Sequence, residues 1–177
     1  YVKAFLKGLK IKRKLLIRYR KLSSVLTSFS TSDYIFFPLH FQPEGTTAPF
    51  GNVFHDQLTC LYYLRSNLDP NILIVVKEHP LTFNRSFSGW WKSSLVKHLK
   101  YYDEIAEIPG VVLADLNTET DDLIDQSLGV VTICGTAFLE AINKNKVAGY
   151  FGSPWYKTCF PKNWLGSKEG FFDFVNG

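Results

Sequence analysis

Residues 72–80 run Ile72-Leu73-Ile74-Val75-Val76-Lys77-Glu78-His79-Pro80. A continuous run of mostly β-branched residues, with no polar alternation, is typical of a strand that is buried on both faces of a parallel sheet. The run passes directly into ionisable residues and a proline, so polar side chains are expected at the carboxyl end of this strand. Four further runs of this kind occur along the chain. The five predicted strands are residues 34–39, 72–76, 111–114, 130–133 and 147–151.

Helix-like segments separate these runs. They cover residues 56–67, 89–102, 118–127 and 136–145, with Thr118 and Thr136 as helix-start signals. Strands and helices in alternation predict an α/β fold with an open, doubly wound parallel sheet, which is a Rossmann-like architecture.

The composition excludes several classes of protein. A chain of 177 residues with 46% hydrophobic and 20% charged residues has the make-up of one compact globular domain. Its longest aliphatic run, residues 72–76, is far short of the ~20 residues that cross a bilayer, and no signal-peptide pattern follows the N-terminus. The cysteines at 60, 134 and 159 form no CxxC pair, which argues against a disulfide framework and a zinc site. A cytoplasmic location is expected.

The charge is unevenly distributed. Residues 1–21 contain nine Lys or Arg and no acidic residue, whereas the remaining 156 residues carry 11 basic against 16 acidic side chains. The acidic body argues against nucleic-acid binding. The basic segment predicts an amphipathic helix that lies on an anionic membrane surface or packs on a domain outside this chain. We therefore expect a basic helix and linker at 1–33 and a separate Rossmann-like domain at 34–177.

Ligands of open parallel sheets bind beyond the carboxyl ends of the strands, so the residues that follow each predicted strand are the site candidates. Gly135 and Thr136 lie where a helix begins, and a phosphate fits there because glycine allows close backbone approach and helix N–H groups point outward. Glu140, one turn later, is suited to accept from ribose hydroxyls. In the alternative interpretation Thr136 is only a helix cap and Glu140 a surface acid.

Lys77 and His79 are two residues apart at a strand end, so both can face one side and donate to phosphate oxygens. The alternative for His79 is a structural histidine. His40, Gln42 and Glu44 offer a general base, an amide and a carboxylate, although Glu44 also suits a capping role. No P-loop, dinucleotide, zinc-protease or serine-hydrolase motif is present, and no metal or other cofactor is required.

Four segments together resemble the bacterial capsular polysaccharide biosynthesis and export family. They are Pro38-Leu39-His40-Phe41-Gln42-Pro43-Glu44, Val76-Lys77-Glu78-His79-Pro80, Thr132-Ile133-Cys134-Gly135-Thr136-Ala137 with Glu140-Ala141, and Phe151-Gly152-Ser153-Pro154-Trp155-Tyr156. That family includes retaining β-Kdo transferases of the two-domain GT-B plan, which use CMP-Kdo. The Lys-Glu-His-Pro stretch is also similar to the His-Pro motif of bacterial sialyltransferases, where the histidine meets the donor phosphate.

The resemblance implies a glycosyltransferase, or its donor-binding half, that transfers Kdo or a similar acidic sugar to a glycan or glycolipid acceptor. His79 and Thr136 would hold the donor phosphate, Glu140 the ribose, and His40, Gln42 and Glu44 the sugar side. Ser153, Trp155 and Tyr156 complete the substrate-binding candidates. A GT-B enzyme has two Rossmann-like halves, so an N-terminal acceptor domain is expected outside this chain. The alternatives are a non-catalytic glycan-binding or export module and a sugar-nucleotide epimerase.

Overall fold

The computed structural model describes residues 2–29, 31–84 and 96–176. Its centre is a five-stranded sheet in the order β3-β2-β1-β4-β5, with every neighbouring pair parallel. The α/β fold with an open parallel sheet is thus confirmed. The strands are β1 (Tyr34–Pro38), β2 (Leu73–Lys77), β3 (Val111–Leu113), β4 (Gly129–Thr132) and β5 (Val147–Tyr150).

The strand order reverses direction between β1 and β4. After β1 the chain adds β2 and β3 on one side, and it then crosses over to add β4 and β5 on the other side. Such a topological switch point leaves a crevice outside the carboxyl ends of the two strands, where ligands of open α/β sheets bind. The fold itself therefore places a candidate site between the ends of β1 and β4.

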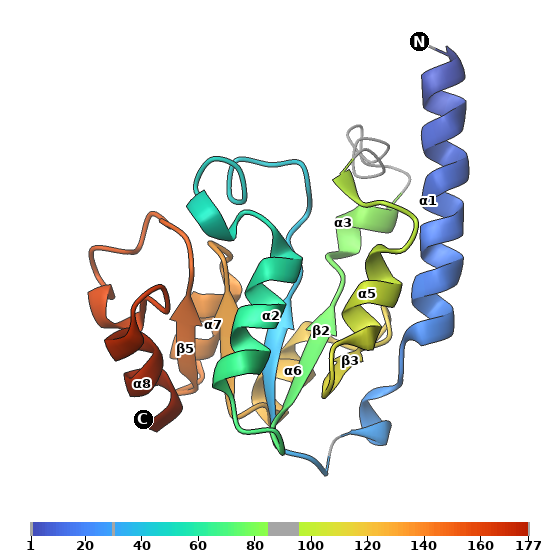
Figure 1. Ribbon diagram of the computed structural model, residues 1–177. Helices are drawn as coiled ribbons and strands as arrows, with labels where there is room; N and C mark the ends of the chain where they lie inside the picture. Colours follow the sequence, from blue (N-terminus) through green and yellow to red (C-terminus); the bar gives the residue numbers. More distant parts are fainter. Residues whose placement is uncertain (1, 30, 85–95, 177) are drawn as a thin grey trace.

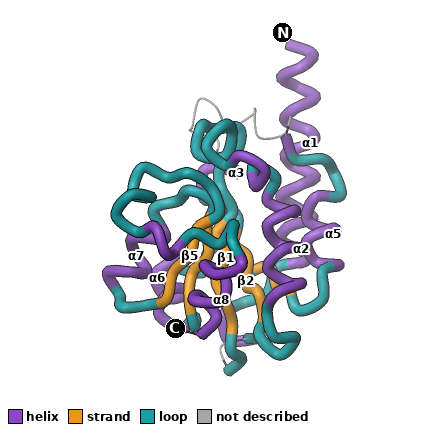
Figure 2. The backbone as a smooth tube through the Cα atoms, turned by 60° about the vertical axis from the view of Figure 1, so that its left-hand side comes forward, coloured by secondary structure: helices purple, strands orange, loops and turns teal. Residues whose placement is uncertain are grey.

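Helices cover both faces of the sheet, and Figure 2 shows the strands between the two layers. On one face lie α1 (Val2–Leu22), α2 (Gln57–Asn67), α5 (Tyr101–Glu107) and α8 (Lys168–Asn176), and on the other face lie α6 (Thr120–Gln126) and α7 (Ala137–Asn143). Short helices α3 (Pro80–Phe83), η1 (Leu26–Ser28), η2 (Asn52–Phe54) and η4 (Pro161–Asn163) lie in the connections.

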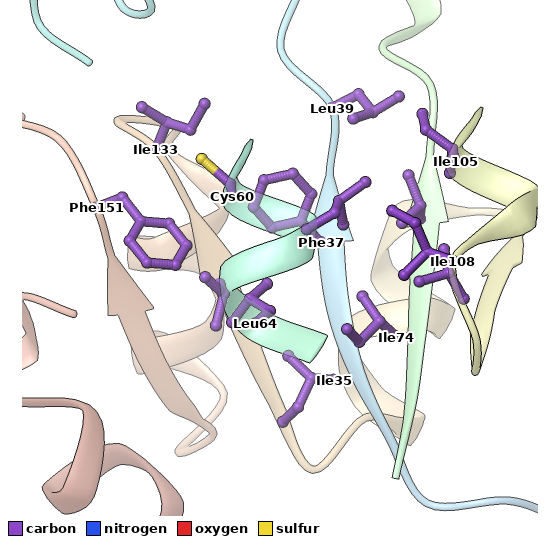
Figure 3. Packing of buried hydrophobic residues seen from close by; sticks show 14 of the residues in the cluster. Ile35, Phe37, Leu39, Cys60, Leu64, Ile74, Ile105, Ile108, Ile133 and Phe151 are labelled. Atoms are coloured by element: carbon purple, nitrogen blue, oxygen red, sulfur yellow. The ribbon is translucent and has the colours of Figure 1, made fainter. Parts of the chain in front are cut away.

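Helix α2 packs directly on the face of the sheet that also carries α1, α5 and α8. Its Cys60 and Leu64 are fully buried and pack onto Phe37 of β1 and Phe151 after β5 (Figure 3). The helix begins after Asp56, whose carboxylate accepts a hydrogen bond from the Leu58 N–H at 3.2 Å. An Asp at this position satisfies one of the unpaired N–H groups of the first turn.

The sequence prediction missed one helix. Residues 89–95 of the segment predicted at 89–102 lie outside the described residues, and a helix that was not predicted, α5, begins at Tyr101, near the end of that segment. Tyr101, Tyr102 and Ile105 are buried at helical spacing, and the acids Asp103 and Glu104 stand in the first turn, where they favour the helix dipole. These start signals are present in the sequence.

The N-terminal helix packs on its own domain along an unexpected stripe. Among its described side chains the buried positions are Gly8, Lys12, Leu15 and Tyr19, whereas the apolar residues Leu6 and Ile17 are 49% and 59% exposed. Figure 1 shows the N-terminal half projecting past the sheet while the C-terminal half lies beside α5. Leu6 and Ile17 therefore remain at the surface, whereas Leu9 and Leu16 are partly buried.

Two contacts tie the basic segment to the body. The Arg18 guanidinium donates to the Asp103 carboxylate of α5, with 2.6 Å between Nε and Oδ1, which lowers the pKa of Asp103. Ser24, in the predicted linker, forms an isolated bridge with Ala114 next to β3. No helix among the described ranges is both long and apolar enough to cross a membrane.

Candidate functional site

A pocket of about 420 Å³ opens at the carboxyl ends of β1, β2 and β4, at the switch point of the sheet. Eight residues predicted from the sequence to form the site line it together. These are His40, Glu44, Lys77, His79, Gly135, Thr136, Glu140 and Trp155.

His79 is held so that one ring nitrogen remains for a ligand. It caps α3, and its Nδ1 accepts a hydrogen bond from the Leu81 N–H at 3.2 Å. Because Nδ1 is the acceptor, the proton of the neutral ring lies on Nε2. Burial lowers the pKa of His79, against the opposing charges of Glu78 and Glu44. At neutral pH His79 therefore offers the pocket an Nε2–H donor.

Lys77, at the end of β2, supplies a cation. Its side chain is buried, and the ammonium donates to the Thr120 hydroxyl at 3.2 Å. Burial lowers the pKa of Lys77, and the charges of Glu119 and Asp115 oppose that effect. Thr120 begins α6 and also lines the pocket. The sequence prediction missed it, although a threonine at a helix start beyond a strand is a recognisable signal.

His40 supports the turn between β4 and α7. Its Nε2 lies 3.0 Å from the Thr132 hydroxyl and accepts from the backbone N–H groups of Ile133 and Cys134 at 3.3 and 3.4 Å. Thr132 also accepts from the Gly135 N–H at 3.0 Å. Nε2 is therefore occupied as an acceptor, and the proton of the neutral ring lies on Nδ1. The role of His40 as a general base stays a prediction.

Glu44 stands in front of the other nitrogen of His40. Its Oε1 is 3.9 Å from His40 Nδ1 and accepts from the Thr46 hydroxyl at 2.5 Å. Burial would raise the pKa of Glu44, but the nearby His40 ring, the Thr46 hydroxyl and the nearby His79 ring outweigh it and lower the pKa. Glu44 is accordingly ionised at neutral pH. Thr46 lines the pocket and was not among the predicted residues.

The turn after β4 needs glycine at position 135. A Cβ there would lie 2.7 Å from Thr132 Oγ1 and 3.2 Å from His40 Cε1, both closer than ordinary contact. Thr136 follows at the start of α7, but its hydroxyl does not cap the helix. It donates instead to the Glu140 carboxylate at 3.1 Å, and both residues line the pocket.

Three predicted substrate-binding residues do not line the pocket. Gln42 is buried and bonds the His55 carbonyl and the Gln57 amide, because its loop folds back onto α2. Ser153 accepts from the Asn52 amide at 3.1 Å, which joins two loops. Tyr156 is 1% exposed.

Tyr156 supports the turn between β4 and α7 from the core. Its hydroxyl donates to the Gly135 carbonyl at 2.8 Å, and its ring stacks on Phe138 of α7 with 4.7 Å between centroids. Trp155, in contrast, lines the pocket and is 77% exposed. Adjacent residues of one predicted segment thus have different places, one in the core and one at the rim.

The lining as a whole suits an anionic ligand with hydroxyl groups. Lys77 and His79 provide donors from one side, whereas Glu44 and Glu140 provide acceptors. Among the described residues, no group of His, Cys, Asp and Glu side chains is arranged to hold a metal ion. The carboxylate of Asp115, after β3, accepts from the Asn117 N–H at 2.8 Å.

Residues 45–159 match the family model described as capsule polysaccharide biosynthesis protein. The match covers more than half of the chain, so the protein belongs to this family. The comparison with curated proteins found no similar sequence.

Two solved structures from Thermosulfurimonas dismutans share the fold. The KpsC β-Kdo 2,7 transferase is 18% identical with a TM-score of 0.52, over 86% of this chain and 43% of that one. The KpsC β-Kdo 2,4 transferase is 14% identical with a TM-score of 0.50, over 99% of this chain and 56% of that one. The chain therefore spans about half the length of either structure, and at these identities the likeness concerns the fold.

Proposed function

We propose that this chain binds the nucleotide-sugar donor of a glycosyltransferase that builds capsular or other surface polysaccharide. The donor is a CMP-activated acidic sugar such as Kdo. Membership of the capsule biosynthesis family and the shared fold of two Kdo transferases support the class of reaction. The chemistry of the pocket supports a donor that carries a phosphate.

The observation that carries the proposal is the pairing of Lys77 and His79 at the end of β2. Both line the pocket, and His79 has Nε2–H as its free donor once Nδ1 is engaged. Negative charge grows on the phosphate of the leaving nucleotide as the glycosidic bond breaks. Fixed donors that need no reorientation stabilise such charge most effectively.

The two carboxylates of the pocket, Glu140 and Glu44, are proposed to bind the two sugars of the donor. Glu140, oriented by the Thr136 hydroxyl, accepts from ribose hydroxyls. Glu44 faces the transferred sugar as an ionised carboxylate, and His40 orients it through Nδ1. Trp155 provides an exposed aromatic face at the rim.

The acceptor is proposed to bind a second domain outside this chain, because the chain spans 43% and 56% of the two similar structures.

Location at the inner face of the cytoplasmic membrane is proposed from α1. Leu6 and Ile17 are exposed there among basic side chains. Sedimentation with anionic and with zwitterionic vesicles tests this location. Binding to anionic vesicles that is lost in the Leu6→Ser, Ile17→Ser double variant would support it, and failure to bind would contradict it.

Calorimetric titration with CMP, UDP and ADP tests the donor site. We expect CMP to bind selectively and its affinity to fall at least tenfold in His79→Ala, since hydrogen bonds to charged groups are worth about 1.5–3 kcal/mol. Thr136→Ala should also weaken binding. His98→Ala is the matched control, because this imidazole is exposed and pairs with Glu104 away from the pocket.

The alternatives give different results in the same titration. A folded wild-type chain that binds no nucleotide would contradict the proposal and favour a glycan-binding or export module. A preference for UDP would favour a sugar-nucleotide epimerase. Circular dichroism of each variant establishes that a loss of affinity is not a loss of fold.

A further inference from the structure

A buried polar cluster borders the pocket, which Glu78 itself lines, and joins residues from five parts of the chain. We call it the Glu78 junction; it consists of Glu78, Tyr19, Thr82, Lys97 and Tyr102. These residues come from the end of β2, from α1, from α3, from the segment before α5 and from α5 itself. All five are buried. None of them was a predicted site residue, so the junction needs its own explanation.

The carboxylate of Glu78 is fully satisfied. Its Oε1 accepts from the backbone N–H of His79 at 2.8 Å and from the Thr82 hydroxyl at 2.9 Å. Its Oε2 accepts from the Lys97 ammonium and the Tyr102 hydroxyl. A buried carboxylate with four partners is rigid, because moving it breaks several hydrogen bonds in a medium of low dielectric.

Tyr19 brings α1 into the junction. Its hydroxyl accepts from the Glu78 N–H at 3.0 Å and donates to the Ala114 carbonyl at 2.6 Å. Its ring meets Tyr102 edge-on with 4.9 Å between centroids. The N-terminal helix thereby holds both the residue that follows β2 and the residue that follows β3.

These hydrogen bonds together fix the position of His79. Its backbone N–H is held by Glu78, and its Nδ1 accepts from Leu81 N–H in the short helix α3. Thr82 of the same helix is bonded to the same carboxylate. The junction therefore fixes both the main chain and the ring acceptor of the histidine, and so the direction of Nε2.

We infer that Glu78 and Tyr19 are positioning residues that hold His79 in the orientation required for binding the donor phosphate. The ligand in this inference rests on the proposed function, whereas the positioning does not. Stability alone is a weak reason for the arrangement, because buried ion pairs are often no better for stability than well-packed apolar residues.

Tyr19→Phe tests the inference without changing any charge. It removes the hydroxyl that accepts from the Glu78 N–H and donates to the Ala114 carbonyl, and it keeps the ring. Tyr34→Phe is a matched control, because Tyr34 is also fully buried and its hydroxyl donates to a backbone carbonyl, that of Leu123, at 2.9 Å. Tyr34 lies in the core of the opposite face of the sheet.

Two readouts are measured on the full chain. The first is the ¹⁵N spectrum of the His79 ring, which should show the single Nε2–H tautomer in the wild type and in Tyr34→Phe, and a mixture of tautomers in Tyr19→Phe. The second is CMP affinity, which should fall about fivefold in Tyr19→Phe, as expected for one net hydrogen bond, and stay unchanged in Tyr34→Phe.

The two proposals fail in different ways. A wild-type chain that binds no CMP but shows the tautomer change refutes the donor site and supports the positioning role. A single tautomer in Tyr19→Phe, or equal effects of the two variants, overturns the positioning role. Glu78→Gln should have the larger effect on the ring, although it leaves Lys97 without its counter-charge and can unfold the chain. The conclusion therefore depends on Tyr19→Phe.

Discussion

The strongest prediction concerns the close approach at Gly135. In Gly135→Ala the new methyl group would lie 2.7 Å from Thr132 Oγ1 and 3.2 Å from His40 Cε1. Thr132 is fully buried, so its side chain can accommodate the methyl group only by staying in close contact with it or by rotating away. If it stays, the site is overpacked, at a cost of roughly 1–3 kcal/mol. If it rotates, it loses its bonds to His40 Nε2 and to the backbone N–H of residue 135, which are worth about 1 kcal/mol each.

Both responses give a loss of about 2 kcal/mol in the free energy of unfolding. Urea unfolding followed by tryptophan fluorescence measures this loss. Gly45→Ala is the control, because a Cβ there meets only the Phe50 ring at 3.8 Å, which is ordinary contact. It should be neutral or stabilise the chain by up to about 1 kcal/mol. A loss below about 0.5 kcal/mol for Gly135→Ala, or equal losses for the two variants, would refute the reasoning.

Three further predictions follow from the site and the core. Because burial lowers the pKa of His79, its contribution to stability is complete above the unfolded pKa of about 6.5 and is lost as the pH falls toward the lower folded value. His79→Asn keeps an acceptor for Leu81 N–H and should flatten that part of the pH profile of urea unfolding; an unaltered profile would argue against the lowered pKa. Tyr156→Phe should cost about 1 kcal/mol in chemical denaturation, because the Gly135 carbonyl loses its partner at 2.8 Å; no measurable cost would mean that water replaces the hydroxyl. Leu64→Ala, at a fully buried position of α2, should cost about 3 kcal/mol by the same measurement, and a cost under about 1 kcal/mol would be incompatible with the packing of α2 on the sheet.

The strands could be predicted because the sheet is covered on both faces. Phe36 and Phe37 of β1 are both fully buried, one in each of the two cores, so the strand has no polar alternation that could be mistaken for another pattern. The last residue of a strand could not be predicted in the same way. Lys77 belongs to β2 because it pairs with Pro38 of β1, and this pairing is not visible in a hydropathy pattern.

The helix boundaries were harder to predict where aromatic residues occur on both sides of a start signal. Tyr101 and Tyr102 were read as the end of a helix, whereas they begin α5. Tyr102 is buried in the Glu78 junction and meets Tyr19 of α1 edge-on. The contact with Tyr19 joins segments about eighty residues apart in sequence. Local propensity carries no information about such a contact.

The edge of the sheet that holds the site could be predicted, but the atoms that face the ligand could not. Strand order places the residues at the ends of β1, β2 and β4 together, which is why seven of the eight predicted residues share one pocket; Trp155 reaches it from the loop after β5. Gln42 was expected beside them, and its amide instead bonds His55 and Gln57. Which way a loop side chain turns depends on partners that only the folded chain provides.

The two pocket histidines explain what kind of chemistry the site favours. In each ring, one nitrogen accepts from backbone N–H groups: Nε2 of His40 from the turn after β4, and Nδ1 of His79 from the start of α3. The remaining nitrogen of each neutral ring therefore carries the proton, and both rings act as donors. A pocket whose imidazoles donate, beside a lysine, is built to receive negative charge, whereas proton abstraction would need a free ring acceptor. The lowered pKa of Glu44 keeps a carboxylate ionised beside these donors, and our proposal places this carboxylate toward the transferred sugar.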